Sequence, residues 1–169
     1  FWVKGFKDLR LFIMEEVLHE MEFATNAMLD DAGLVGWEVQ YEVERETASG
    51  KTTRGLSIFI KSPDSNGRVR WESWSGGEGQ RLRLVGAFAL SEVLLNHAGV
   101  TTSFEVVDEP TQHMSLPGVR DLCGYLADRA ERLKRQIWLV DHVAIESREF
   151  ASVTTVIRDD KGSRLLAED

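Results

Sequence analysis

One short turn in this sequence carries the residue types that bind phosphate. Residues 75–81 read Ser-Gly-Gly-Glu-Gly-Gln-Arg and stand between a segment that alternates like β structure and a segment with helical periodicity. Glycines let the main chain approach a ligand closely, and a helix that begins just after them offers unpaired N–H groups to an anion. We therefore expect the turn to present donors to phosphate oxygens, with a plain linker as the alternative when the turn is taken alone.

Two further stretches place ionisable side chains at the ends of predicted strands. Asp108 and Glu109 follow a strand that begins at Val100, and His142 follows Ile137–Val140. A carboxylate at a strand end can hold Mg²⁺ through water, because hard cations take oxygen ligands, and a second carboxylate can polarise a water that attacks a phosphoryl group. A histidine at the next strand tip can touch the γ-phosphate or that water. Singly, a strand exit and a structural histidine explain these residues, but in this order with the glycine turn they predict a phosphoryl-transfer site.

A second phosphate-binding pattern in the sequence is a false match. Gly50, Lys51 and Thr52 look like the end of a P-loop, G-x-x-x-x-G-K-[ST], but the first glycine of that motif would fall at Arg45. The residues that follow are strand-like and offer no helix N-terminus to a phosphate. We interpret these residues as a charged hairpin turn and expect that the chain has no P-loop.

The first half of the chain predicts one helix and an antiparallel meander. Apolar residues at helical spacing run from Asp8 to Leu29 and end near Gly33, which indicates an amphipathic helix that faces a core. The segments that follow alternate between apolar and polar residues, as strands with one solvated face do. The predicted strands span residues 37–46, 56–60 and 69–74, with turns at 47–51 and 62–67.

The second half predicts strand–helix–strand units, whose spacing implies a parallel core sheet. Its predicted elements are a helix over 79–98, a strand over 100–107, a helix over 117–136, a short buried strand over 137–140 and a closing hairpin over 153–166. The helix over 117–136 turns Val119, Leu122, Cys123 and Leu126 inward. Its basic residues are expected to face outward, on a solvated rather than a DNA-binding face, and they are Arg120, Arg129, Arg132, Lys134 and Arg135.

The composition is that of an ordinary globular domain. The chain has 169 residues and a net charge of −8, so contact with DNA would need a local basic patch or another chain. A single cysteine, Cys123, excludes an internal disulfide and a Cys-x-x-Cys metal site, and no apolar run reaches membrane-spanning length, so we expect a cytoplasmic protein. The first residue is Phe1 and not Met, which favours a piece of a longer chain.

The three chemical stretches together resemble the motifs of ABC-type ATPases. The turn at 75–81 resembles the signature motif, residues 104–110 (Phe-Glu-Val-Val-Asp-Glu-Pro) the Walker B strand, residues 111–115 the D-loop, and His142 the switch histidine. With the meander before the signature, the chain resembles the C-terminal lobe of the SMC-related SbcC/Rad-fifty double-strand-break repair ATPases, in a phage or bacterial version. The resemblance implies an α/β lobe of an ABC/SMC-type head, with a parallel core sheet and a small antiparallel meander, whose P-loop lobe is missing.

The resemblance treats residues 1–169 as a single lobe made of three segments. Residues 1–34 would be a helix leading from a coiled coil, residues 35–74 the β meander, and residues 75–169 the signature helix, Walker B, D-loop and switch-histidine region. Glu105 is unexpected within a Walker B strand, which suggests that its face of the strand is less buried.

The resemblance also assigns roles in Mg²⁺-dependent ATP hydrolysis, residue by residue. Glu109 would orient or activate the hydrolytic water, Asp108 would ligate Mg²⁺ through water, and His142 would sense the γ-phosphate. The nucleotide on an opposite head would be contacted in trans by the signature residues Ser75, Gly76, Gly77, Glu78 and Gln80. The D-loop departs from the family pattern, because Met114 and Ser115 stand where Leu-Asp is usual.

The function implied is that of an enzyme half that is inactive without an N-terminal P-loop lobe, on the same or a separate chain. Two such heads would dimerise around ATP, and hydrolysis would control an SbcD-like nuclease that acts on DNA ends in recombination repair. One alternative is a structural DNA clamp of the chromosome-maintenance type, without a nuclease. A second is a transporter-type ABC domain, in which the preceding lobe would be helical. We expect no contact with a membrane.

Overall fold

The fold is a mixed α/β arrangement of helices with one antiparallel meander and one parallel strand pair. The computed structural model describes residues 2–43, 56–74, 76–143, 145, 150–160 and 162–166. In chain order the elements are α1 (Trp2–Leu29), β1 (Glu38–Val43), β2 (Leu56–Lys61), β3 (Val69–Arg70), the 3₁₀ turn η1 (Trp71–Ser73), α2 (Gly76–Ala98), β4 (Phe104–Asp108), α3 (Leu116–Leu133), β5 (Gln136–Val140), β6 (Val156–Asp159) and β7 (Gly162–Leu165).

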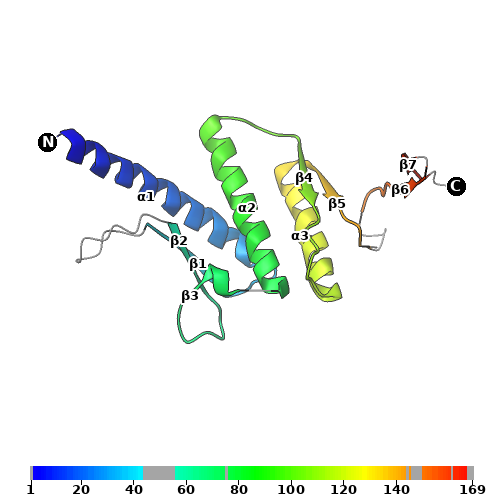
Figure 1. The fold of residues 1–169 in the computed structure, drawn as a ribbon, viewed down its shortest axis with the longest axis horizontal. Helices are drawn as coiled ribbons and strands as arrows, with labels where there is room; N and C mark the ends of the chain where they lie inside the picture. Colours follow the sequence, from blue (N-terminus) through cyan, green and yellow to red (C-terminus); the bar gives the residue numbers. More distant parts are fainter. Residues whose placement is uncertain are drawn as a thin grey trace.

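The elements form two groups that lie side by side (Figure 1). The meander β1–β2–β3 packs with α1 and α2 in the first group, and β4, α3 and β5 form the second. The β6–β7 hairpin lies at the C-terminal end of the molecule, away from the meander. Side chains of α2 and α3 join the two groups in one core, where the rings of Phe88 and Tyr125 lie with their centroids 5.8 Å apart.

Helix α1 ends where the sequence predicts and covers the free edge of the meander. Gly33 adopts a positive φ of 75°, a conformation that ends helices. The side-chain amide of Asn26 accepts a hydrogen bond from the N–H of Val39 and donates one to its carbonyl, both at 2.8 Å. Since β1 is an edge strand, this amide pairs with backbone groups that would otherwise be open to another strand.

The meander is shorter than its sequence pattern predicts. β1 and β2 pair in an antiparallel register that places Val39 opposite Ile60, and both are buried. The predicted third strand stops after Arg70, and a 3₁₀ turn follows because Trp71 and Trp74 turn toward the core, where Trp74 lies 4.7 Å from Trp37 between ring centroids. The predicted turn at 47–51 and the false P-loop match at Gly50, Lys51 and Thr52 both lie outside the described residues.

The parallel pair has one covered and one exposed face. β4 and β5 pair from Phe104 opposite Gln136 to Asp108 opposite Val140, and Val107 packs in the core with α3. The prediction of a buried strand over 137–140 is wrong for its alternate residues, because a strand pair covered by one helix leaves its other side chains open. The exposed apolar side chains of this face are Phe104, Val106, Trp138 and Val140, at 57%, 56%, 52% and 49% of full exposure.

Helix α3 covers one face of the parallel pair. Helix α3 begins at Leu116, close to the predicted Pro117, and buries the predicted Val119, Leu122, Cys123 and Leu126.

Among the described residues, no helix has the length and apolar character needed to cross a membrane.

Candidate functional site

The parallel pair brings the ends of β4 and β5 together, and with them two predicted catalytic residues. The N–H of Glu109 donates to the carbonyl of Val140 at 2.8 Å, which continues the strand pairing by one step. Glu109 then turns sharply, with a φ of 46°. Its Oε1 lies 3.7 Å from Nδ1 of His142, and both side chains are largely open to solvent. The parallel pairing of β4 and β5 therefore places a carboxylate and an imidazole side by side at the carboxyl ends of the two strands.

Glu109 has a second partner, Gln112, which no sequence motif indicates. The amide of Gln112 donates to Oε2 of Glu109 at 2.5 Å, so the carboxylate has a polar neighbour at each oxygen. A solvent-exposed carboxylate held between an amide and an imidazole is suited to orienting a water molecule. A glutamine three residues after a glutamate is too common a spacing to have predicted this contact.

The predicted magnesium ligand, Asp108, is an exposed residue at the last position of β4. Among the described residues no group of three or more metal-ligating side chains comes together. One exposed carboxylate fits a Mg²⁺ ion that keeps most of its waters and takes its other ligands from nucleotide phosphates. Asp108 therefore fits the predicted water-mediated role, and the structure offers one carboxylate for it.

The signature turn packs directly on the D-loop. Ser75 lies outside the described residues, and α2 begins at Gly76, three residues before the predicted start. A Cβ at Gly77 would lie 3.3 Å from the carbonyl oxygen of His113, and one at Gly79 would lie 2.9 Å from the carbonyl oxygen of Trp74. These two glycines are therefore needed for close backbone approach within the chain, in addition to any contact with a ligand.

Two more predicted residues of the turn and the D-loop have partners within the chain. The side-chain amide of Gln80 donates to the carbonyl of Pro110 at 3.2 Å, which ties the start of α2 to the loop after β4. Ser115 is the N-cap of α3 and accepts from the N–H of Gly118 at 3.4 Å. Met114 packs at the border of the core, and Glu78 is exposed in the first turn of α2. The signature turn and His142 thus both contact a single loop, residues 109–115, which begins at Glu109.

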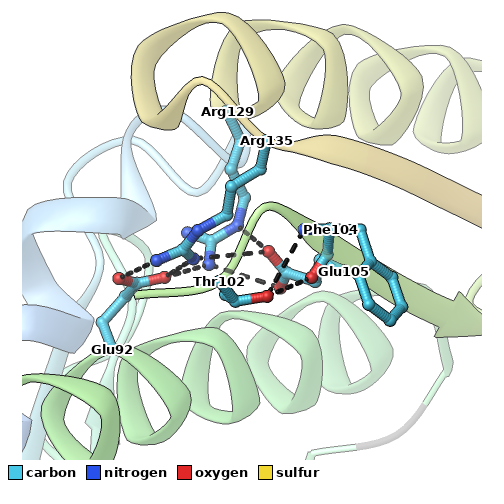
Figure 2. A network of polar contacts seen from close by, with 6 residues as sticks. All are labelled: Glu92, Thr102, Phe104, Glu105, Arg129 and Arg135. Atoms are coloured by element: carbon cyan, nitrogen blue, oxygen red, sulfur yellow. Dashed lines mark hydrogen bonds and ion pairs between the residues drawn. The ribbon is translucent and has the colours of Figure 1, made fainter. Parts of the chain in front are cut away.

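A buried ion cluster links α2 to the second group and overturns part of the sequence interpretation (Figure 2). Arg129 was expected to face outward with Arg135, but the Arg129 side chain is only 1% exposed. It donates to Oε1 of Glu92 at 2.6 Å and to Oε2 of Glu105 at 3.1 Å, and Arg135 also pairs with Glu92. Both arginines point back to the core because each reaches a carboxylate on another element, whereas Arg132 remains on the surface.

The cluster also corrects the prediction for the Walker B strand. Glu105 lies on the better-covered face of β4, with its side chain 14% exposed, and its neighbours Phe104 and Val106 occupy the open face. Burial alone would raise the pKa of Glu92, but hydrogen bonds and charge from Arg135 and Arg129 outweigh burial and hold the pKa below its usual value. A glutamate is tolerated within this strand because two guanidinium groups neutralise it.

Comparisons with known proteins identify solved structures with the same fold but assign no sequence family. No protein-family model and no curated protein sequence matches the chain. Among solved structures, one from work on the ATP-driven dimerisation and DNA-stimulated activation of SMC ATPases has a similar fold. It matches with a TM-score of 0.72 and 15% identity, over 93% of this chain and 88% of that one.

Two further structures have the same fold. The Smc head domain with a coiled coil and joint from Pyrococcus yayanosii matches with a TM-score of 0.68 and 17% identity, over 99% of this chain and 30% of that one. An Smc head bound to the C-winged-helix domain of ScpA matches at 0.65 and 16%, over 90% of this chain and 43% of that one. The chain therefore has the fold of part of an SMC head, and it spans less than half of these two relatives.

Proposed function

We propose that this chain is the C-terminal lobe of an ATP-hydrolysing head of the SMC type. The observation that carries the proposal is the convergence of Glu109, His142 and the signature turn on one loop at the carboxyl end of a parallel strand pair. In this proposal Glu109 orients the attacking water, Asp108 holds Mg²⁺ through water and His142 contacts the γ-phosphate. ATP supplies the phosphoryl group, and the ion neutralises charge that develops on its oxygens.

The proposal requires a P-loop lobe, and the open face of β4–β5 is the surface that would receive it. Four large apolar side chains lie on this face, including Trp138 and Phe104, and among the described residues β4 pairs only with β5. A contiguous apolar face at a free sheet edge is typical of an interface with another element. A P-loop-bearing lobe on this face would bring its phosphate-binding loop beside Asp108 and Glu109.

The signature turn would act on a second head. Helix α2 begins with Gly76-Gly77 and offers its first N–H groups at the surface, where Gly76 and Glu78 are exposed. In an ATP-sandwiched dimer, Ser75, Gly77 and Gln80 would contact the γ-phosphate bound by the opposite head. For Gln80 this requires the side chain to release the carbonyl of Pro110.

The role of the whole assembly has two candidates. In the first, ATP hydrolysis controls an SbcD-like nuclease that processes DNA ends in recombination repair. In the second, the heads open and close a DNA clamp without a nuclease, and the likeness to Smc heads, one of them bound to ScpA, favours this alternative. Co-purification with a metallophosphoesterase would favour the first candidate. A hinge domain at the far end of the coiled coil would favour the second.

Binding between this chain and a P-loop-bearing lobe tests the proposal without measuring ATP hydrolysis. The chain should bind a P-loop-bearing lobe, and Trp138→Glu should weaken that binding at least about tenfold, because it places a charge in an apolar interface. Val35→Glu is the matched control, since Val35 is 68% exposed in the loop between α1 and β1. Equal binding by the two variants would count against the proposed interface.

A further inference from the structure

Asp141 is a buried carboxylate beside the candidate site that the proposed chemistry does not use. It follows the last residue of β5 and precedes His142, and its side chain is only 3% exposed. A carboxylate is costly to bury unless hydrogen bonds satisfy it. Both of its oxygens are satisfied, and the donors come from two different loops.

The donors to Asp141 connect the loop after β4 to the loop after β5. Oδ2 accepts from the hydroxyl of Thr111 at 2.6 Å and from the N–H of the same residue at 3.3 Å. Oδ1 accepts from the N–H of Val143 at 2.9 Å, which closes a tight turn around His142. Thr111 is itself buried, at 4% exposure, so its hydroxyl has little water to bond instead.

We infer that Asp141 and Thr111 form a clamp that positions His142 beside Glu109, and the inference rests on the proposed function only for its effect on turnover. Glu109 lies two residues before Thr111, and His142 directly follows Asp141. Fixing Thr111 to Asp141 therefore fixes the two exposed side chains relative to each other, 3.7 Å apart. Their own contact is open to solvent, where a single ion pair contributes little, so the order must come from the buried partners.

The bidentate geometry determines which variants break the clamp. An asparagine at 141 keeps one acceptor oxygen and replaces the other by a donor, so it cannot serve both Thr111 and Val143. Valine at 111 keeps the shape of threonine and removes the hydroxyl, whereas serine keeps the hydroxyl. Asp141 and Thr111 are positioning residues, because Asp141 acts through His142, whose Nδ1 lies 3.8 Å from its Oδ1, and Thr111 acts through Asp141. Thr111→Val leaves the Asp141 charge beside His142 in place, so it is the variant that isolates the clamp.

The first test measures His142 directly and needs no nucleotide. Nuclear magnetic resonance of the imidazole ring in the intact chain should show altered His142 signals in Thr111→Val and Asp141→Asn, and wild-type signals in Thr111→Ser. The matched control is Thr102→Val, which removes a hydroxyl that bonds the carbonyl of Phe104 at the opposite end of β4. Asp141→Asn also removes a charge 3.8 Å from Nδ1 of His142, so Thr111→Val decides the test. Unchanged His142 signals in Thr111→Val, with thermal unfolding showing that the variant is folded, would overturn the inference.

The second test asks whether the clamp serves turnover. In the head reassembled with a P-loop lobe, Thr111→Val should lower kcat about tenfold and leave KM for ATP within about twofold, because a misplaced group costs transition-state stabilisation more than binding. Thr111→Ser should restore kcat. Full kcat in Thr111→Val, despite altered His142 signals, would refute the role in turnover. If wild-type heads fail to hydrolyse ATP, the proposed function fails and the imidazole signals still decide the clamp.

Discussion

Among single residues, Glu109 has the most demanding role in the proposed chemistry. Its carboxylate is exposed and lies between His142 and Gln112, so a water molecule can reach it. Its backbone is held by pairing with Val140, which leaves the side chain as the part free to do chemistry. The position follows from the strand register and does not require the carboxylate itself to stabilise the fold.

Replacing the Glu109 carboxylate by an amide tests this role. Glu109→Gln should slow ATP hydrolysis by the reassembled head about 10²–10⁴-fold, the usual effect of losing a positioned base, and should leave ATP binding intact. Steady-state phosphate release and nucleotide binding measure the two effects. Glu131→Gln is the control, because it makes the same chemical change at an exposed site on α3. Turnover equal in both variants would remove Glu109 from the mechanism.

The stabilisation of the fold by Asp141 should depend on pH. Burial would raise its pKa, but hydrogen bonds from the Thr111 side chain and from the N–H groups of Val143, Thr111 and His142 outweigh burial and hold the pKa below its ordinary value of 3.8. A lowered pKa means that the stabilisation is present above the ordinary value and is lost as the pH falls through the lowered one.

The difference in unfolding free energy between wild type and Asp141→Asn should therefore be constant near neutral pH and shrink below about pH 4. Urea unfolding from pH 7 to pH 3 measures it. A difference that stays constant down to pH 3 would contradict the assignment of the buried carboxylate as ionised.

At the level of secondary-structure elements, the ion cluster attaches α2 to β4. Arg129 of α3 lies between Glu92 of α2 and Glu105 of β4, and its guanidinium also lies 4.6 Å from the ring centroid of Phe88. Arg135, at the junction of α3 and β5, adds a second bond to Glu92. The cluster contains two carboxylates and two guanidiniums, so removing one member leaves buried charge unpaired.

Removal of Arg129 should be costly. Arg129→Met should lower the free energy of unfolding by about 3–5 kcal/mol, because the two carboxylates lose a buried partner. Arg132→Met is the matched control on the same helix and should cost less than about 1 kcal/mol, since its pair with Asp31 is exposed. Chemical denaturation measures both values. Similar losses in the two variants would show that the cluster is an ordinary surface network.

Sequence periodicity predicted these elements better than it predicted their contacts. The 3.6-residue period located the three long helices, because that signal is local. It did not locate all of their ends, since α1 begins at Trp2 and not at Asp8, and α3 ends at Leu133 and not at Gln136. The helical pattern places Arg129 and Arg135 on the face opposite the apolar residues of α3. Only the fold shows that Glu92 on α2 and Glu105 on β4 lie within their reach. Trp71 and Trp74 continued a strand pattern in sequence, but burying two indoles against the core outweighed pairing with β2.

The positions of the candidate site residues could be predicted from the sequence, but not all of their contacts. Strand ends predicted Asp108, Glu109 and His142, because parallel strands bring their carboxyl ends to one edge. The contribution of Asp141 depends on a hydroxyl thirty positions earlier in the chain, at Thr111, and no local pattern indicates such a pairing.

At the level of the whole molecule, the chain has the fold of part of an SMC head, and the β4–β5 pair has an open apolar face, which is the surface proposed to receive the P-loop lobe. The catalytic residues proposed here stand at the margin of that face, and the signature turn opens toward solvent. The central claim is that the site is composite: this chain supplies the water-orienting residues and a second lobe supplies the P-loop.

The most direct test of this claim is the rate of ATP hydrolysis by the chain alone and with a P-loop-bearing lobe, each with and without Mg²⁺. We expect no turnover above background for either part alone, and Mg²⁺-dependent turnover when the two are mixed. Hydrolysis by this chain alone, or none by a mixture that demonstrably pairs and binds ATP, would contradict it.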